Sequence, residues 1–330
     1  AGNNTTRTSI RSGRNRFRGF NESHVIFYNV YINPLDIRYS EAVMNDQIRQ
    51  IYKSSFRLIP IYFNIIGHNH TRHICSSDMD CRQMRYLPVG NEEDTLQDLY
   101  EFCQENPNVT ATYLHDKGSY SKVGSSKRVR RTVTTSSISD ACRSISQPDV
   151  TCDTCGLKFN LLPYHHTNGN MWTAKCEYIR KLYPPKNYER KRTEMFQYIQ
   201  SNSTLLNSFD CLSTMLDDFN KTEEYTGDAQ KNLALGRYAM EQWVFSHPSV
   251  RPCYTMEKSM FAYSSKNPWI PSLTHVTGSF VFASGGLKGT DWFQRDGRLF
   301  QMRHIYGMDP PNSSFFWRLY PARNGSHKCG

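Results

Sequence analysis

Three runs of β-branched and aromatic residues in the first third of the chain predict strands. They cover residues 24–32, 58–66 and 109–114. Between consecutive runs, apolar residues recur at spacings of three and four, which is the pattern of a helix with one buried face. This spacing predicts helices over residues 40–52 and 94–103.

The order β-α-β-α-β predicts parallel strands joined by right-handed crossovers. We therefore expect an α/β fold with a Rossmann-like, mostly parallel sheet flanked by helices. Ligands of such sheets usually bind beyond the carboxyl ends of the strands, which here are residues 31–34, 67–73 and 115–120. Asp94 and Gln97, three residues apart, resemble a capping box at the start of the second helix.

The second half of the chain has a more helical pattern. Helical spacing predicts helices over residues 188–200 and 228–245, and a short apolar run predicts a strand over 276–283 that returns to the sheet. No internal repeat is present at the periods of solenoids or propellers. We expect a single domain over residues 24–330 with a helical C-terminal part.

Two polar, basic segments interrupt this pattern. Residues 1–23 have little to bury and predict an extended basic arm, and residues 119–140 predict a mobile basic loop within the domain. Inside that loop, Arg128 to Arg131 has the dibasic form that secretory processing proteases cleave. A flexible basic loop that is not cleaved explains the same residues equally well.

Composition narrows the classes of partner. The 330 residues carry 40 Lys+Arg against 30 Asp+Glu, a net charge of +10, which favours anionic partners such as phosphates, sulfated glycans or nucleic acid. An aromatic content of 13% supplies apolar area and argues against intrinsic disorder. No stretch approaches the roughly 20 apolar residues that cross a bilayer, so we expect no membrane-spanning segment in these residues.

Sequons and cysteines indicate the secretory pathway. An even set of 10 cysteines is compatible with several disulfides in an oxidising compartment. The chain begins at Ala1 without methionine, so we expect that an upstream signal peptide or anchor has been removed or left out. We therefore expect the Golgi lumen or the extracellular space. The predicted glycosylation sites are Asn3, Asn4, Asn21, Asn69, Asn108, Asn202, Asn220, Asn312 and Asn324.

The end of the third predicted strand carries candidate chemistry. His115, Asp116 and Lys117 follow the strand and precede Gly118. In α/β enzymes that use sugar nucleotides, this position usually carries paired carboxylates with a divalent metal; here there is one acid beside a histidine and a lysine. A cationic side chain could stabilise a leaving diphosphate without a metal, and glycine allows close approach of the backbone. The alternative interpretation is a polar turn.

Two groups of histidines near cysteines raise the question of zinc. They are His165 and His166 after Cys152 and Cys155, and His68, His70 and His73 before Cys75. The first spacing is not that of a zinc finger, and a glycan on Asn69 would crowd the second. We expect disulfides instead; a divalent metal is compatible with the sequence but is not indicated by it.

The run from Gly169 to Trp172 predicts a glycine turn that leads into a packed segment. A tryptophan flanked by polar groups also suits a sugar, which needs a flat apolar face and oriented hydrogen-bond partners. Packing in the core is the alternative.

Several segments together resemble a family of glycosyltransferase-like proteins of algae, other protists and large DNA viruses. The resemblance is carried by residues 113–120, 152–185 and 297–321, with 25–34 and 59–67 similar to the first two strands of that family. It implies a nucleotide-sugar-binding fold of the A type with an acceptor-binding half. Many A-type transferases use an Asp-X-Asp metal site. Here that motif occurs only at residues 78–80, outside the expected strand end, so the resemblance implies an activity that is either metal-independent or lost.

The resemblance and the residue types together give the candidate site. For catalysis we expect His115, Asp116, Lys117, Asp153 and Glu177, with Asp149, Asp153 and Glu177 left open as general bases for an inverting displacement. For donor binding we expect Tyr28, Asn29, Gly118, Asn170 and Trp172, and for acceptor binding His165 and His166.

Two classes of function remain open. The first is a secretory glycosyltransferase that moves a sugar from a nucleotide donor to a glycan or protein acceptor. The second is a secreted structural or assembly protein that keeps the transferase fold without turnover and binds protein neighbours in a filament or coat. Secretory residence argues against nucleic acid as a partner despite the charge.

Overall fold

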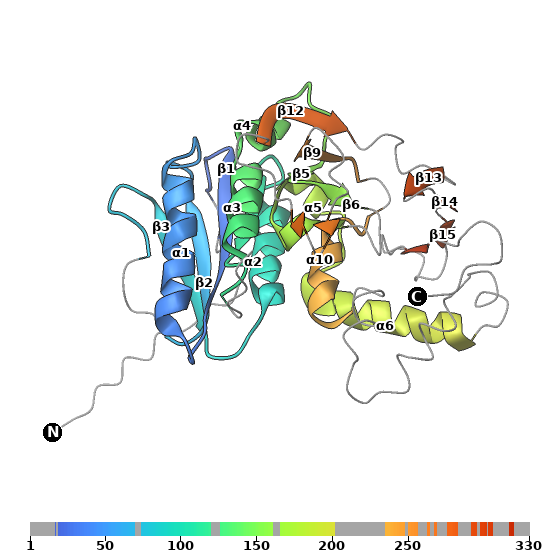
Figure 1. Cartoon of the computed structure of the whole chain (residues 1–330), viewed down its shortest axis with the longest axis horizontal. Coiled ribbons are helices and arrows are strands. Elements are labelled where there is room, and N and C mark those ends of the chain that lie inside the picture. The colour runs from blue at the N-terminus through green and yellow to red at the C-terminus, as the bar shows by residue number, and fades with distance from the viewer. Residues whose placement is uncertain are drawn as a thin grey trace.

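One sheet of eight strands forms the centre of the computed structural model, in the order β12-β9-β5-β8-β4-β1-β2-β3 (Figure 1). The structure describes residues 17, 19–69, 74–119, 126–160, 166–201, 235–247 and 250–256, and beyond these the strand segments 263–264, 267–268, 276–282, 292–295, 298–301, 303–305 and 317–319.

The sheet is mixed and mostly parallel. Its strands are β1 (His24–Ile32), β2 (Ile61–Gly67), β3 (Cys81–Leu87), β4 (Thr110–His115), β5 (Thr154–Gly156), β8 (Trp172–Lys175), β9 (Pro252–Met256) and β12 (Val276–Phe282). The strands β1 to β4 are parallel to one another, and β5 is parallel to β9. β8 runs antiparallel between β4 and β5, and β12 is antiparallel to β9. The predicted Rossmann-like α/β fold is therefore confirmed.

Helices cover both faces of this sheet. They are α1 (Ile37–Tyr52), α2 (Glu92–Glu105), α3 (Ser126–Ser137), α4 (Asp140–Arg143), α5 (Cys176–Ile179), α6 (Pro185–Ser201) and α10 (Ala239–Trp243). Apolar side chains of α1 and α3 pack in one core with Ile26 and Tyr28 of β1, whereas those of α2 pack in another with Val25 and Phe27. Because successive residues of a strand point to opposite faces, α1 and α3 cover one face and α2 the other.

Short elements complete the described chain. They are η1 (Ser144–Ser146), β6 (Phe159–Asn160) paired with β7 (His166–Thr167), η2 (Asn168–Asn170), η3 (Gly236–Tyr238), and the strand pairs β10 (Tyr263–Ser264) with β11 (Asn267–Pro268), β13 (Trp292–Arg295) with β14 (Arg298–Gln301), and β15 (Arg303–Ile305) with β16 (Trp317–Leu319). The helix predicted over 228–245 is present in part, as η3 and α10, while residues 228–234 lie outside the described residues. The predicted strand at 276–283 is confirmed as β12; beyond Pro252 the described elements are strands.

The sequence pattern did not predict β3. This strand lies at the edge of the sheet, and Arg82 and Gln83 in it are exposed. An edge strand with polar side chains lacks the apolar run that identifies a buried strand, so its residues looked like a loop.

The mobile loop predicted over 119–140 is wrong for its second half. Residues 126–137 form α3, which buries Arg130, Thr132 and Val133. A helix rich in Ser, Thr and Arg has only a weak apolar stripe, so its sequence alone does not predict a helix. Packing against α1 and the sheet stabilises it instead. Arg130 is buried within this helix, which argues against protease processing at Arg128 to Arg131.

The predicted N-terminal arm is wrong at its inner end. Phe17 is buried and makes edge contacts with the rings of Phe27, Tyr62 and Phe102, and Phe20 packs on Phe102. The core thus begins before β1. Residues 1–16 and 18 lie outside the described residues.

The capping box of α2 begins three residues earlier than predicted. Asn91 is the N-cap: its side chain accepts from the Glu93 backbone N–H, and the Asp94 carboxylate accepts from the Asn91 backbone N–H. Asp94 is therefore the third residue of the helix and not its cap.

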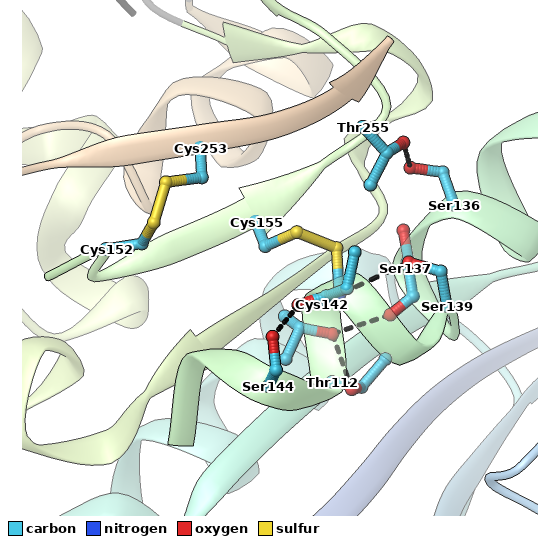
Figure 2. Close-up of a disulfide and its surroundings, with 12 residues drawn as sticks. Thr112, Ser136, Ser137, Ser139, Cys142, Ser144, Cys152, Cys155, Cys253 and Thr255 are labelled. Carbon is cyan, nitrogen blue, oxygen red and sulfur yellow. Dashed lines mark hydrogen bonds between the residues drawn. A yellow bond between two sulfur atoms is a disulfide. The ribbon is translucent and has the colours of Figure 1, made fainter. Parts of the chain in front are cut away.

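Four disulfides pair eight of the ten cysteines: Cys75–Cys81, Cys103–Cys176, Cys142–Cys155 and Cys152–Cys253. Figure 2 shows the last two beside each other; Cys142–Cys155 joins α4 to β5, and Cys152–Cys253 joins the segment just before β5 to β9. The expectation of several disulfides is confirmed, and the bond between Cys75 and Cys81 closes a small loop. Cys211 and Cys329 lie outside the described residues.

Among the residues that the structure describes, no helix combines the length and the hydrophobicity that crossing a membrane requires.

Candidate functional site

The strand order changes direction between β1 and β4. From β1 the chain moves outward through β2 and β3, and it returns to the other side of β1 to form β4. In open α/β sheets such a switch point creates a crevice at the carboxyl ends of the two strands. His115 ends β4 at this place, in register with Asn29 of β1. The fold therefore puts the predicted residues 115–118 where ligands of such sheets bind.

His115 is held by acceptors on both ring nitrogens. Its Nδ1 lies 3.2 Å from Oε1 of Glu92, and its Nε2 lies 2.6 Å from the carbonyl oxygen of Gly169. A carboxylate and a carbonyl can only accept, so both contacts are hydrogen bonds when the ring is a doubly protonated imidazolium. Burial lowers the pKa of His115, but the charge and hydrogen bond of Glu92 outweigh it, and the pKa is raised overall. The two acceptors therefore fix the ring in place and favour its protonated form.

Glu92 is the acid that anchors this cluster. Its Oε2 accepts from the Tyr113 hydroxyl at 3.1 Å and from Nδ2 of Asn170 at 2.6 Å. Burial raises the pKa of Glu92, but the imidazolium and these hydrogen bonds outweigh it and lower the pKa overall. As the first residue of α2, Glu92 also lies at the helix end that favours negative charge.

A tight turn carries the Gly169 carbonyl to the histidine. Gly169 and Asn170 both have positive φ, of 77° and 48°. A Cβ at Gly169 would lie 3.3 Å from Cδ of Lys117 and 3.2 Å from a methyl group of Val133, so glycine is needed both for the backbone conformation and for space. Asn170 accepts from the Trp172 indole N–H at 3.2 Å, which fixes the turn to β8.

Asp116 joins the ends of β1 and β4. The backbone N–H of Tyr31 donates to its Oδ2 at 2.8 Å, and Ser119 also hydrogen-bonds to it. Burial raises the pKa of Asp116 to about 8 against the opposing charge of His115, so the group is mostly a neutral acid at pH 7. It positions the strand ends and is a poor nucleophile.

Lys117 and Gly118 form the outer side of the turn after β4. Lys117 is partly exposed, and within the described residues its side chain forms no ion pair. Its carbonyl accepts from Nη1 of Arg130 at 3.0 Å. Gly118 has φ of 89°, and a Cβ there would lie 2.9 Å from Cβ of Ser126. The turn therefore fixes the lysine backbone and leaves its ammonium group available to a ligand.

Three side chains predicted to bind the donor are buried. Tyr28 donates to Gln47, Asn29 accepts from Thr95, and Trp172 lies in the core with no exposed surface. The donor-binding prediction is wrong for these side chains, because each is enclosed by its own partners. Asn170 is also buried, and it reaches the site only through Glu92.

Asp153 and Glu177 lie near the amino end of β4, whereas His115 lies at its carboxyl end. Because β8 is antiparallel to β4, Lys175 at its end pairs with Thr110, the first residue of β4. Glu177 follows Lys175, and the backbone N–H of Lys175 donates to the carbonyl of Asp153. The carboxylate of Asp153 is held in turn by Arg251 at 2.8 Å. The prediction that these acids share a site with His115 is wrong.

Asp149 is exposed in the stretch between η1 and β5. The acid that the structure does bring to His115 is Glu92, which the sequence analysis did not select. A signal was present in the acidic first turn of α2, because the start of a helix between two parallel strands lies at the carboxyl ends of those strands.

The remaining histidines do not form a metal cluster in the described part of the chain. Cys152 and Cys155 are in two different disulfides, so they are not zinc ligands. No group of three or more His, Cys, Asp or Glu residues suited to a metal occurs among the residues that are described. His166 lies half-buried in β7, while His165, His70 and His73 lie outside the described residues.

The ion pair gives a testable pH dependence. Glu92→Gln is expected to lower the pKa of the His115 ring, since burial then acts without the compensating carboxylate. Titration of the ring resonances by NMR measures this shift. An unchanged or higher pKa in the variant would contradict the assignment of the pair.

The same pair predicts how stability depends on pH. The pKa of His115 is raised in the folded protein. Its contribution to the free energy of unfolding is therefore complete below the ordinary pKa of 6.5 and is lost as pH rises through the raised value. Because the folded pKa of Glu92 is lowered, its contribution is complete above 4.5 and is lost as pH falls through the lowered value. The pair therefore stabilises the folded protein most between pH 4.5 and 6.5. In denaturant titrations, Glu92→Gln should lower the free energy of unfolding most in this range.

Comparison with known proteins gives one family. A family model described as "Domain of unknown function (DUF8361)" matches residues 27–319. The match includes all strands of the central sheet, although it begins inside β1, and thus contains His115, Glu92 and the turn at Gly169. No curated protein and no solved structure matches the chain.

Proposed function

We propose that this chain, a member of the DUF8361 family of unknown function, is a glycosyltransferase of the secretory pathway, on the ground of the site at the carboxyl ends of β1 and β4. It transfers a sugar from a nucleotide donor to a glycan or protein acceptor. The resemblance described above and the Rossmann-like sheet support this class.

The single observation that carries the proposal is the cationic strand end at the switch point. Glu92 and Gly169 place acceptors at both ring nitrogens of His115, which favours the imidazolium, and Lys117 follows two residues later with its ammonium group unpaired within the described residues. When the bond between sugar and diphosphate breaks, negative charge develops on the diphosphate oxygens. A preorganised cation at that position stabilises this charge.

The roles of the residues follow from their exposure. Lys117, which is partly exposed, contacts the diphosphate. His115 is only 13% exposed, so it acts through the positive potential it adds and through the turn that it holds. Asp116 and Gly118 give the loop its shape, and the backbone of the turn at Gly169 faces the donor sugar.

The Asp-X-Asp motif does not take part in this site. Asp78 and Asp80 precede β3, at the amino end of the sheet, and each is paired with an arginine, Arg57 and Arg82. The proposed reaction therefore uses side-chain cations for the diphosphate at the β4 end, and the motif belongs to the surface loop closed by Cys75 and Cys81.

Secretory residence is supported by the disulfides and by the exposed sequons. Asn21, Asn69 and Asn108 are the predicted glycosylation sites that lie in the described residues, and all three are exposed. The other six lie outside them. Exposure is what the glycosylation machinery and a bulky glycan require.

The proposal is tested with a panel of nucleotide sugars. We expect one donor to be hydrolysed, or transferred to an added acceptor, and to raise the melting temperature of the protein, because ligand binding stabilises the folded state. Each donor is assayed with a chelator and with added divalent cations. Failure of every donor both to turn over and to shift the melting temperature would contradict the enzymatic proposal.

A second function is favoured by the burial of the cluster. His115, Glu92 and Asn170 satisfy one another, as they would in a protein that keeps this fold only as a scaffold for assembly. Electron microscopy and size-exclusion chromatography of the purified protein distinguish the two. A stoichiometric filament or coat without donor turnover supports the scaffold, and a soluble monomer that turns over a donor supports the enzyme.

A further inference from the structure

A cavity of about 250 Å³ lies between α1 and α3, on one face of the sheet. Figure 1 shows these two helices side by side, and their residues are in contact. The volume accommodates a ligand of several heavy atoms and not merely one water molecule. We call this cavity the α1–α3 groove; it is lined by Tyr39, Ala42, Val43, Asp46, Arg49, Lys127, Arg130 and Arg131.

The groove has a strong excess of positive charge. Four of its lining residues are cationic and one is anionic. Within the described part of the chain, Arg49 and Lys127 form no ion pair. The cations of two helices line this one groove, which raises the local positive potential.

Arg130 is the buried element of the groove. Its side chain is only 3% exposed, and its Nη1 donates to the Lys117 carbonyl. Its Nη2 lies 3.4 Å from Oδ2 of Asp46, and its Nε has no hydrogen-bond partner. A buried guanidinium with a weak ion pair and an unsatisfied N–H is costly for the fold on its own. An anion in the groove would offset that cost.

Asp46 cannot neutralise the groove by itself. It accepts from Nε of Arg131 at 3.0 Å with both oxygens, and it faces Arg130 as well. Burial raises the pKa of Asp46, but these two arginines outweigh it and lower the pKa overall, so the carboxylate is charged. The single carboxylate of Asp46 is thus shared between the guanidinium groups of Arg130 and Arg131. No carboxylate that lines the groove is left to pair with Arg49 or Lys127.

We propose that the α1–α3 groove is a second ligand site, which binds the phosphate or sulfate group of an anionic ligand. Guanidinium groups match the geometry of tetrahedral oxyanions through paired N–H donors. Arg49 and Lys127 neutralise the outer oxygens, and Arg130 and Arg131 reach the inner ones. The groove adjoins the candidate catalytic site through the hydrogen bond from Arg130 to the Lys117 carbonyl, but its lining side chains come from α1 and α3 and not from the strand ends.

The test compares two double variants with the same change in charge. Arg49→Gln with Lys127→Gln removes two cations that line the groove, whereas Arg38→Gln with Lys53→Gln removes two exposed cations of α1 outside it. Binding of inorganic sulfate, pyrophosphate and a sulfated heparin oligosaccharide is measured by calorimetry at fixed ionic strength. Far-ultraviolet circular dichroism checks that all proteins are folded.

We expect at least one probe to bind the wild-type protein and to bind the groove variant about tenfold more weakly or worse, a change of about 1.4 kcal/mol. The control variant should change by less than about twofold. Binding of sulfate or pyrophosphate alone identifies a small oxyanion ligand, and binding of the oligosaccharide alone identifies a sulfated glycan. No binding by any probe, or equal loss in both variants, overturns the proposal.

This result is independent of the proposed transferase activity. A transferase without a second site would turn over donors and show no difference between the two double variants. A scaffold with the second site would show the difference without turning over any donor.

Discussion

Lys117→Ala is expected to reduce donor turnover by about a hundredfold or more while leaving the melting temperature unchanged. Removal of one preorganised group that stabilises developing charge typically costs about 10² to 10³ in rate. The side chain of Lys117 is partly exposed and forms no ion pair within the described residues, so its loss should leave the fold intact. Initial rates with the donor selected by the panel measure the effect.

Two further variants make this result specific. Lys117→Arg keeps the charge but changes its geometry, and it should retain part of the activity. Lys53→Ala removes an exposed lysine at the end of α1 and should behave as the wild-type protein. Wild-type turnover in Lys117→Ala would show that the diphosphate binds elsewhere.

The second large effect concerns the disulfide between Cys152 and Cys253. Replacing both by serine is expected to lower the free energy of unfolding by about 4 to 5 kcal/mol. The bond links residues 101 apart in the sequence, and the loss of loop entropy in the unfolded chain grows with the length of the loop. It also joins the residues just before β5 to β9 beside the Cys142–Cys155 bond (Figure 2).

The Cys75–Cys81 disulfide is the matched control. Its cysteines are only 6 residues apart, and the same relation gives about 2 kcal/mol. Guanidinium titrations of both double-serine variants measure the two losses. Equal losses, or a larger loss for the short loop, would contradict the account in which the long bond stabilises the sheet through chain entropy.

The parallel half of the sheet could be predicted because its strands are buried on both faces. The runs at 24–32 and 58–66 are almost continuously apolar, and the structure buries nearly every residue of β1 and β2. The same logic failed for β3, whose polar side chains lie at an edge, and for α3. In α3, packing of Val133 and Thr134 against neighbours overrides a weak local pattern.

The candidate site could be predicted only where it is local in sequence. Residues 115–118 were found because they follow a recognisable strand. Asp153 and Glu177 were misplaced because their position depends on β8 being antiparallel, which apolar periodicity does not encode. Glu92 was missed because its contact with His115 joins the start of α2 to the end of β4, residues that lie 23 apart in the sequence. Contacts between residues that are far apart in the sequence depend on the order and direction of the strands, which local patterns do not specify.

The central claim is that a nucleotide diphosphate binds at the carboxyl ends of β1 and β4. Hydrogen exchange measured by mass spectrometry, with and without the nucleoside diphosphate of the active donor, tests it most directly. We expect slower exchange in peptides that contain residues 113–119 and 166–172, with peptides around Asp153 and Glu177 unchanged. No change at the β4 end, or protection confined to peptides elsewhere in the chain, would contradict it.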